Sequence, residues 1–397
     1  MERYHTLQPM VQNLLAPQST SRMVLAQKRI SFAQSMNPSR IQWIDNEKGF
    51  ILLGVCIAHI GFSWNIFPYL VSFHMAAFFF LSGLLFRPDR DWSEFFHTKC
   101  KNLLFPYLIL SLFFLFLTPS LYQLSTHYPG SLWQNHIAAL LTDNPYLHSL
   151  FVQIQIYLLD IINGYSAPYV TPLWFVLTLF ILNILWFFPI RWLSRYTFGK
   201  YVLGILAIIL FVLGWLLYMH GINPTFKTAV LVTSSAFFIG GFILKDLIPY
   251  LSRIKQYWLL LLTLVMAAIY TYGTKIASVT AIGYVLNELH PNLLAYTAVS
   301  WGGTFLLTLL FIIIDRINKP LFIGHILRLI AQNGIAILAL HAYILGCMTW
   351  ASDTFALPLL ANKWLIALTI IIFCIIALPF INKYLYVCVG KKKPQAV

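Results

Sequence analysis

Three histidines, His59, His74 and His341, fall inside the long apolar segments of this 397-residue chain. The apolar cores of these segments hold no Asp, Glu, Lys or Arg. An ionisable side chain inside a membrane is costly, so each histidine is a candidate functional group. Histidine changes charge near neutral pH, which suits general acid–base or proton-transfer chemistry. The alternative role is structural, with the imidazole hydrogen-bonded to a neighbouring helix.

The spacing predicts that His59 and His74 lie at similar depth. The first apolar segment begins near Ile44, so His59 lies roughly 22 Å along it at about 1.5 Å per residue. That is about 8 Å from the outer edge of a membrane core of about 30 Å. The second segment returns from near Phe67 and places His74 roughly 10 Å below the same edge. We therefore expect the two imidazoles to form one proton-transfer centre.

The segments that carry these histidines belong to a membrane protein. The chain is 59% hydrophobic and 10% charged, whereas a soluble domain carries about 25% charged residues. The sequence predicts an all-α polytopic membrane bundle of about ten transmembrane helices. The segments with the length for spanning are 44–64, 67–87, 102–120, 172–190, 201–219, 228–246, 257–272, 293–314, 334–350 and 364–385.

The positive charges predict how the bundle is oriented. With the N-terminus inside, all but three of the 26 Lys and Arg residues fall in cytoplasmic segments, and the exceptions are Lys227, Lys275 and Lys363. This asymmetry predicts that both termini are cytoplasmic. The net charge of +14 is then a topology signal, and nucleic acid is not an expected partner. The five cysteines have no paired spacing, so we expect neither disulfides nor a metal site.

Three regions divide the chain. Residues 1–40 are polar and lack the apolar core of a signal peptide, which predicts a flexible cytoplasmic extension. Translation could begin at Met1 or at Met36. The transmembrane domain is expected over 41–388, followed by a basic cytoplasmic tail over 389–397.

A spaced motif surrounds the first two histidines. The chain reads IDNEK at 44–48, and His59 follows Lys48 after ten intervening residues. The next segment reads FHMAAFF at 73–79 and ends in Ser-Gly at 82–83. This pattern resembles the opening of the acyltransferase-3 family of membrane-bound O-acyltransferases, most closely the fucose 4-O-acetylase type.

Weaker matches extend the resemblance over about 44–345. They are LWF at 173–175, FFIG at 237–240 and the Asn to His spacing of 333–341. Lys48 stands where the family more often has Arg.

The resemblance implies a reaction. Family members move an acyl group, usually acetyl, from cytoplasmic acetyl-CoA to a hydroxyl of an extracytoplasmic carbohydrate, such as a polysaccharide or lipopolysaccharide. The location implied is the bacterial cytoplasmic (inner) membrane, with acetyl-CoA, a glycan and the lipid bilayer as partners and no metal.

The resemblance also suggests roles for individual residues. Lys48, Lys99 and Lys101 would hold the anionic phosphates of CoA. His59 would be the general base or a transient acyl carrier, and His74 would orient it or share its proton.

Supporting residues have alternative roles. Asp45 would hold Lys48 or the start of the helix. Trp174 is a sugar-stacking wall or an interfacial anchor. His341 is structural or contacts the substrate.

Two other functions fit an intramembrane histidine pair. One is a proton-coupled transporter or flippase, because such histidines also form proton relays. The other is a non-catalytic membrane component. The acceptor glycan, the acyl group, partner subunits and the oligomeric state stay open.

Overall fold

The computed structural model describes most of the predicted transmembrane domain. The predicted N-terminal extension and the end of the basic tail lie outside the described residues, and so does most of the region between 118 and 170. The described residues are 41–61, 69, 72–117, 155, 158–159, 171–222, 227–251, 253–277, 288–317 and 322–391.

Helix forms in each of the ten predicted segments, and no β-strand occurs among the described residues. The helices of these segments are α3 (Gln42–Ile60), α5 (His74–Leu84), α7 (Phe105–Leu117), α11 (Trp174–Leu185) with α12 (Phe187–Leu193), α13 (Gly199–Met219), α14 (Thr228–Leu244), α16 (Gln256–Ile276), α17 (Leu293–Arg316), α19 (Gly334–Thr354) and α20 (Lys363–Tyr384).

Shorter helices join the long ones. They are α6 (Trp92–Lys99), the π-helical η1 (Cys100–Leu104), the 3-10 helices η2 (Thr171–Leu173), η3 (Lys245–Leu247), η5 (Pro358–Ala361) and η6 (Tyr386–Val389), and the α-helices α15 (Ile248–Leu251) and α18 (Phe322–Gln332).

Six of the described helices are long and apolar enough to cross a membrane, and the bent pair of α18 and α19 would make a seventh if it is one span. The all-helical membrane bundle is thereby confirmed. The described α5 and α7 have 11 and 13 residues, fewer than the roughly 20 of a full span. The number of ten and the cytoplasmic termini stay predictions.

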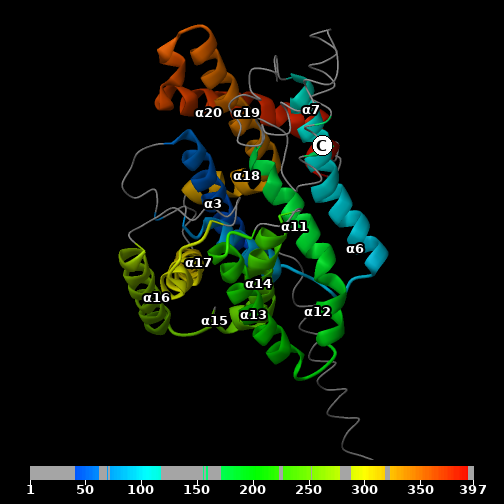
Figure 1. Cartoon of the computed structure of the whole chain (residues 1–397), viewed down its shortest axis with the longest axis vertical. Helices are drawn as coiled ribbons and strands as arrows, with labels where there is room; N and C mark the ends of the chain where they lie inside the picture. The colour runs from blue at the N-terminus through cyan, green and yellow to red at the C-terminus, as the bar shows by residue number, and fades with distance from the viewer. Residues whose placement is uncertain are drawn as a thin grey trace, which may run out of the picture. The chain divides into compact units, whose positions relative to one another are not determined.

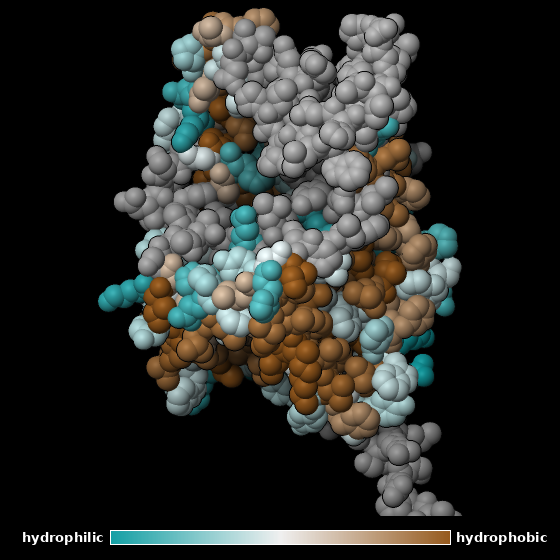
Figure 2. All heavy atoms as spheres, in the orientation of Figure 1, coloured by the Kyte–Doolittle hydropathy of each residue, from teal (hydrophilic) through white to brown (hydrophobic). Residues whose placement is uncertain are grey.

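The outer helices present apolar side chains that water would not favour. Ile208 of α13, Leu264 of α16 and Ile376 of α20 are 66%, 67% and 70% exposed. Figure 2 shows hydrophobic side chains gathered in a broad region on one face. A contiguous apolar surface of this kind marks a protein or membrane contact, and on helices of spanning length it fits contact with lipid.

Helix α5 lies at the centre of the bundle, where Ala76, Phe79 and Leu81 are fully buried. It packs closely on α14, because a Cβ placed on Gly83 would lie 1.8 Å from the backbone oxygen of Phe238. Small residues allow two membrane helices to approach this closely. The Ser-Gly end of the second motif therefore has a packing role.

We expect Gly83→Ala to destabilise the bundle by about 2 kcal/mol, the usual scale of overpacking. The added methyl would meet backbone, which can yield only if α5 and α14 separate. Gly204→Ala is the matched control, because its Cβ would meet only Ile243 Cδ1, at 4.0 Å. Thermal unfolding of the purified variants measures the effect, and equal melting temperatures for the two would contradict it.

Helix α3 is held by the bent pair α18 and α19, whose axes differ by 86°. A Cβ on Gly49 would lie 2.0 Å from the backbone oxygen of Leu327 in α18. A Cβ on Gly334, the first residue of α19, would lie 2.8 Å from Leu52 Cδ1. In Figure 1 the blue α3 lies beside α18. The bend thus gives the two halves of α3 different neighbours.

Candidate active site

Two of the three intramembrane histidines meet near the end of α3. The ring centroids of His59 and His341 lie 5.3 Å apart, with the ring planes inclined at 38°. His59 stands at the last turn of α3, and His341 lies about two turns into α19. Ile60 and Ile344 share one buried apolar cluster and fix the two helices against each other at this level.

The two rings differ in their surroundings. The side chain of His59 is exposed, whereas His341 is fully buried. His59 is thus the more accessible of the two rings. The ring contact described for His59 is with His341, and the pairing of His59 with His74 stays a prediction. His74 is half-buried at the start of α5, and most of the residues between His59 and His74 lie outside the described part.

The tautomer of His341 follows from its backbone contact. Nδ1 lies 2.8 Å from the carbonyl oxygen of Ile337, one turn earlier in α19. A carbonyl only accepts, so Nδ1 carries the hydrogen and donates it. In the neutral ring Nε2 then keeps its lone pair. Nε2 is buried, and among the described residues it has no hydrogen-bond partner.

Burying a polar atom without a partner costs about 1–3 kcal/mol. Such a cost is typical of functional sites, where stability is given up for chemistry. In His341 the atom is an acceptor, and its ring lies 5.3 Å from the ring of His59, measured between the centroids. The pair is therefore a candidate for sharing a proton, and both roles predicted for His341, structural or in contact with the substrate, stay open.

A second group of candidates lies at the other end of α3. Lys99, the last residue of α6, is close enough to Lys48 and Arg90 for their positive charges to repel. Burial and these two charges lower the pKa of Lys99 to about 8. Cations that lower one another's pKa in this way favour the binding of an anion between them. The charges of Lys48 and Lys99 thus lie within interacting distance of each other, and phosphate binding by these lysines stays a prediction.

The same region holds residues that sequence reasoning did not single out. Arg90 is held in part by Arg191, whose Nη1 donates to the Arg90 carbonyl oxygen at 3.2 Å. Its only sequence signal was its place in the charged run after the second segment. Lys101 is exposed on η1, two residues beyond Lys99.

Glu47 is the other residue that was missed. It is fully buried and directly precedes Lys48 in the chain. Thr308 Oγ1 of α17 donates to Glu47 Oε1 at 2.9 Å. Asp45 lies in the first turn of α3, where a carboxylate favours the helix dipole. The foot of α3 thus contains a buried carboxyl that is hydrogen-bonded to α17.

Trp174 begins α11 and is buried. The ammonium nitrogen of Lys227 lies 5.0 Å from the centroid of its ring, which is the geometry of a cation–π contact. A sugar that stacks on Trp174 would therefore have to use the other face of the ring. The preceding η2 packs on α19, so Trp174 is linked to the helix that carries His341.

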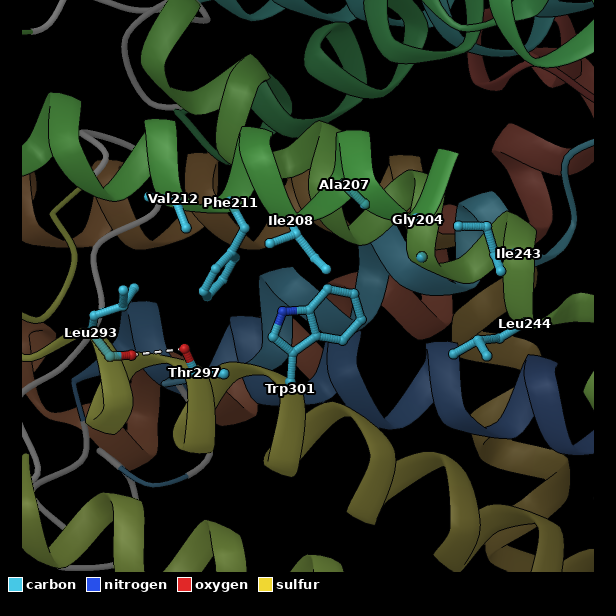
Figure 3. A pocket seen from close by; sticks show the side chains of 11 residues that line it. Gly204, Ala207, Ile208, Phe211, Val212, Ile243, Leu244, Leu293, Thr297 and Trp301 are labelled. Atoms are coloured by element: carbon cyan, nitrogen blue, oxygen red, sulfur yellow. Dashed lines mark hydrogen bonds between the residues drawn. The ribbon is translucent and has the colours of Figure 1, made fainter. Parts of the chain in front are cut away.

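A separate cavity of about 410 Å³ lies between α13, α14 and α17. Figure 3 shows Phe211 and Trp301 facing into it, together with aliphatic side chains. Its one hydroxyl, on Thr297, donates to the Leu293 carbonyl oxygen at 2.7 Å. The cavity contains no ionisable side chain, so it offers no group for acid–base chemistry.

Comparison with known proteins gives one match. The model of the acyltransferase-3 family, described as an acyltransferase domain, matches residues 41–382. Neither a curated protein nor a solved structure matches the chain significantly. The matched region contains both histidines of the pair and the lysines at the foot of α3.

Proposed function

Because the chain belongs to the acyltransferase-3 family, we propose that it moves an acetyl group from cytoplasmic acetyl-CoA to a hydroxyl of an extracytoplasmic surface carbohydrate. The acceptor class is a polysaccharide or lipopolysaccharide, and the location is the bacterial cytoplasmic (inner) membrane. The observation that carries the proposal is the contact between exposed His59 and buried His341, whose Nε2 keeps a lone pair.

In the proposed reaction His59 is the general base. It takes the proton of the acceptor hydroxyl as the hydroxyl oxygen attacks the thioester carbonyl carbon. The new C–O bond forms, the C–S bond breaks, and the CoA thiolate leaves with the proton that His59 returns. The products are the acetyl ester and CoA.

His341 positions the base in this scheme. Its Nδ1 hydrogen is held by Ile337, so Nε2 can accept the N–H of one His59 nitrogen. The other nitrogen of His59 then keeps its lone pair for the acceptor. Such contacts are often long in a free enzyme and tighten when substrate binds. His74 is proposed to share the proton from the first turn of α5.

The donor is proposed to bind at the foot of α3. Lys48 and Lys99, with Arg90 and Lys101, would hold the CoA phosphates. Lys48 and His59 lie on one helix, eleven residues and so roughly 16 Å apart. An extended pantetheine arm covers a comparable length, so the thioester can reach His59 while the phosphates stay on the lysines.

The test uses membranes that contain the protein, labelled acetyl-CoA and surface glycan from the host. We expect label to enter the glycan only when the protein is present. Proton-coupled uptake of a solute without turnover of acetyl-CoA would instead support the transporter. If no label enters any glycan and no CoA is released, the acyl-transfer proposal is refuted.

The affinity for CoA is expected to fall as the pH rises from 7 to 9. Lys99 with a pKa of about 8 is charged below this value and neutral above it, whereas the CoA phosphates are already ionised at pH 7. Losing one charged contact weakens the affinity for CoA about tenfold. Lys99→Arg keeps its charge over this range and should flatten the profile.

Equilibrium binding of labelled CoA to purified protein measures this profile. The exposed Lys200→Arg, on α13, is the control. If wild type and Lys99→Arg show the same slope with pH, Lys99 does not contact the donor.

A further inference from the structure

A polar cluster joins the end of the chain to the bend between α18 and α19. Lys391 Nζ donates to Asn333 Oδ1 and to Asn382 Oδ1, both at 2.6 Å. Asn382 Nδ2 also donates to Asn333 Oδ1 at 2.9 Å. Asn333 is buried, and its own Nδ2 donates to the Leu329 carbonyl oxygen. The cluster thus fixes the position of one ammonium group.

On one side the cluster approaches the proposed donor site, and the contact is made by η1. Gly390 has a φ of +71°, and a Cβ there would lie 2.8 Å from the backbone of Asn102. Asn102 directly follows Lys101 and comes three residues after Lys99. The close approach therefore places Lys391 next to the turn of helix that carries both lysines.

On the other side the cluster meets α3. Gly334 follows Asn333 directly and packs against Leu52. Leu52 lies one helical turn above Lys48, so Asn333 is close to the same end of α3. Chain neighbours of Lys48, Lys99 and Lys391 are therefore in contact, although the three lysines come from separate parts of the chain.

We propose that Lys391 is a further phosphate-binding residue for the CoA donor, and that Asn333 and Asn382 position it. The inference rests on the proposed function. Amide oxygens are neutral, so they orient the ammonium group and do not cancel its charge. A cation gathered with others of the same sign fits a polyanion such as the 3′-phosphate and diphosphate of CoA.

The experiment measures binding to the purified full-length protein in detergent. The ligands are labelled CoA and pantetheine, which has the same arm but no nucleotide phosphates. We expect Lys391→Gln to weaken CoA binding about tenfold, or about 1.4 kcal/mol, and to leave pantetheine binding unchanged. Lys391→Arg should retain most of the affinity for CoA.

Lys383→Gln is the matched control. It removes the same charge from the exposed end of α20, where Lys383 lies over the Tyr384 ring. We expect it to change the dissociation constant of CoA by less than about twofold, because surface charges that touch no ligand contribute little.

The remaining outcomes contradict the proposal in different ways. Equal CoA binding by wild type and Lys391→Gln overturns it and leaves the proposed function intact. Equal weakening of CoA and pantetheine shows that Lys391 only holds the fold. If the variant loses bound anionic phospholipid and not CoA, the site belongs to lipid headgroups. If wild type does not bind CoA at all, the donor of the proposed function is wrong too.

Discussion

Replacing His59 with alanine should lower acetyl transfer about 1,000-fold at matched expression, within the usual range for removing a general base. His59 is the exposed member of the pair, so it is the ring that can meet an acceptor hydroxyl. The dissociation constant of CoA should stay within about twofold, since the phosphates are proposed to bind roughly 16 Å away at Lys48. Initial rates and equilibrium binding separate the two effects.

His220→Ala is the control for His59→Ala. His220 is exposed at the C-terminal end of α13, away from the helices of the pair. Its replacement should leave the rate unchanged. If His59→Ala transfers label as fast as wild type, His59 is not the base and the site model fails. If the variant loses CoA binding as well, the loss of rate reports a damaged fold instead of missing chemistry.

The foot of α3 shows what a sequence can predict about this protein. Lys48 and His59 lie on one continuous helix, so their separation follows from counting residues. Lys99 was identified through the family resemblance, since a basic helix start follows the second apolar segment. The helices were predictable as well, because a long apolar segment has few other ways to form its backbone hydrogen bonds in a membrane.

The contact between His59 and His341 could not be predicted, for a physical reason. Counting residues gives the depth of a side chain in the membrane, but it gives neither the face of the helix nor the neighbour on that face. His341 contacts His59 from α19, which follows an 86° bend after α18. Helix α18 was not predicted, since its apolar residues alternate with polar ones and do not form a span.

Contacts between distant segments were missed as well. In the sequence the basic tail indicated only topology. The packing of Gly390 on Asn102 shows that the residue before Lys391 contacts the helical turn that carries Lys101. The bond between Glu47 and Thr308 joins residues 261 positions apart. Such pairs carry no local pattern, so they become visible only when the helices are packed.

His341→Phe should lower the turnover number about 100-fold and leave the KM for acetyl-CoA unchanged. Phenylalanine retains a ring of similar size but removes the Nε2 acceptor that is proposed to hold the N–H of His59. A positioning residue that acts only in the transition state lowers kcat without raising KM. The donor phosphates bind at the other end of α3, so the affinity for acetyl-CoA does not depend on His341.

The melting temperature separates this role from a structural one. Nε2 of His341 is buried without a partner among the described residues, so replacing it with an apolar edge removes a cost of about 1–3 kcal/mol. The Ile337 carbonyl oxygen loses the Nδ1 donor but can accept from the backbone N–H of residue 341 within α19. We therefore expect His341→Phe to melt at or above the wild-type temperature while its turnover falls. A histidine that only joined helices would give the reverse, a less stable protein with normal turnover. Stability that is given up at a catalytic site is instead recovered when the catalytic side chain is removed.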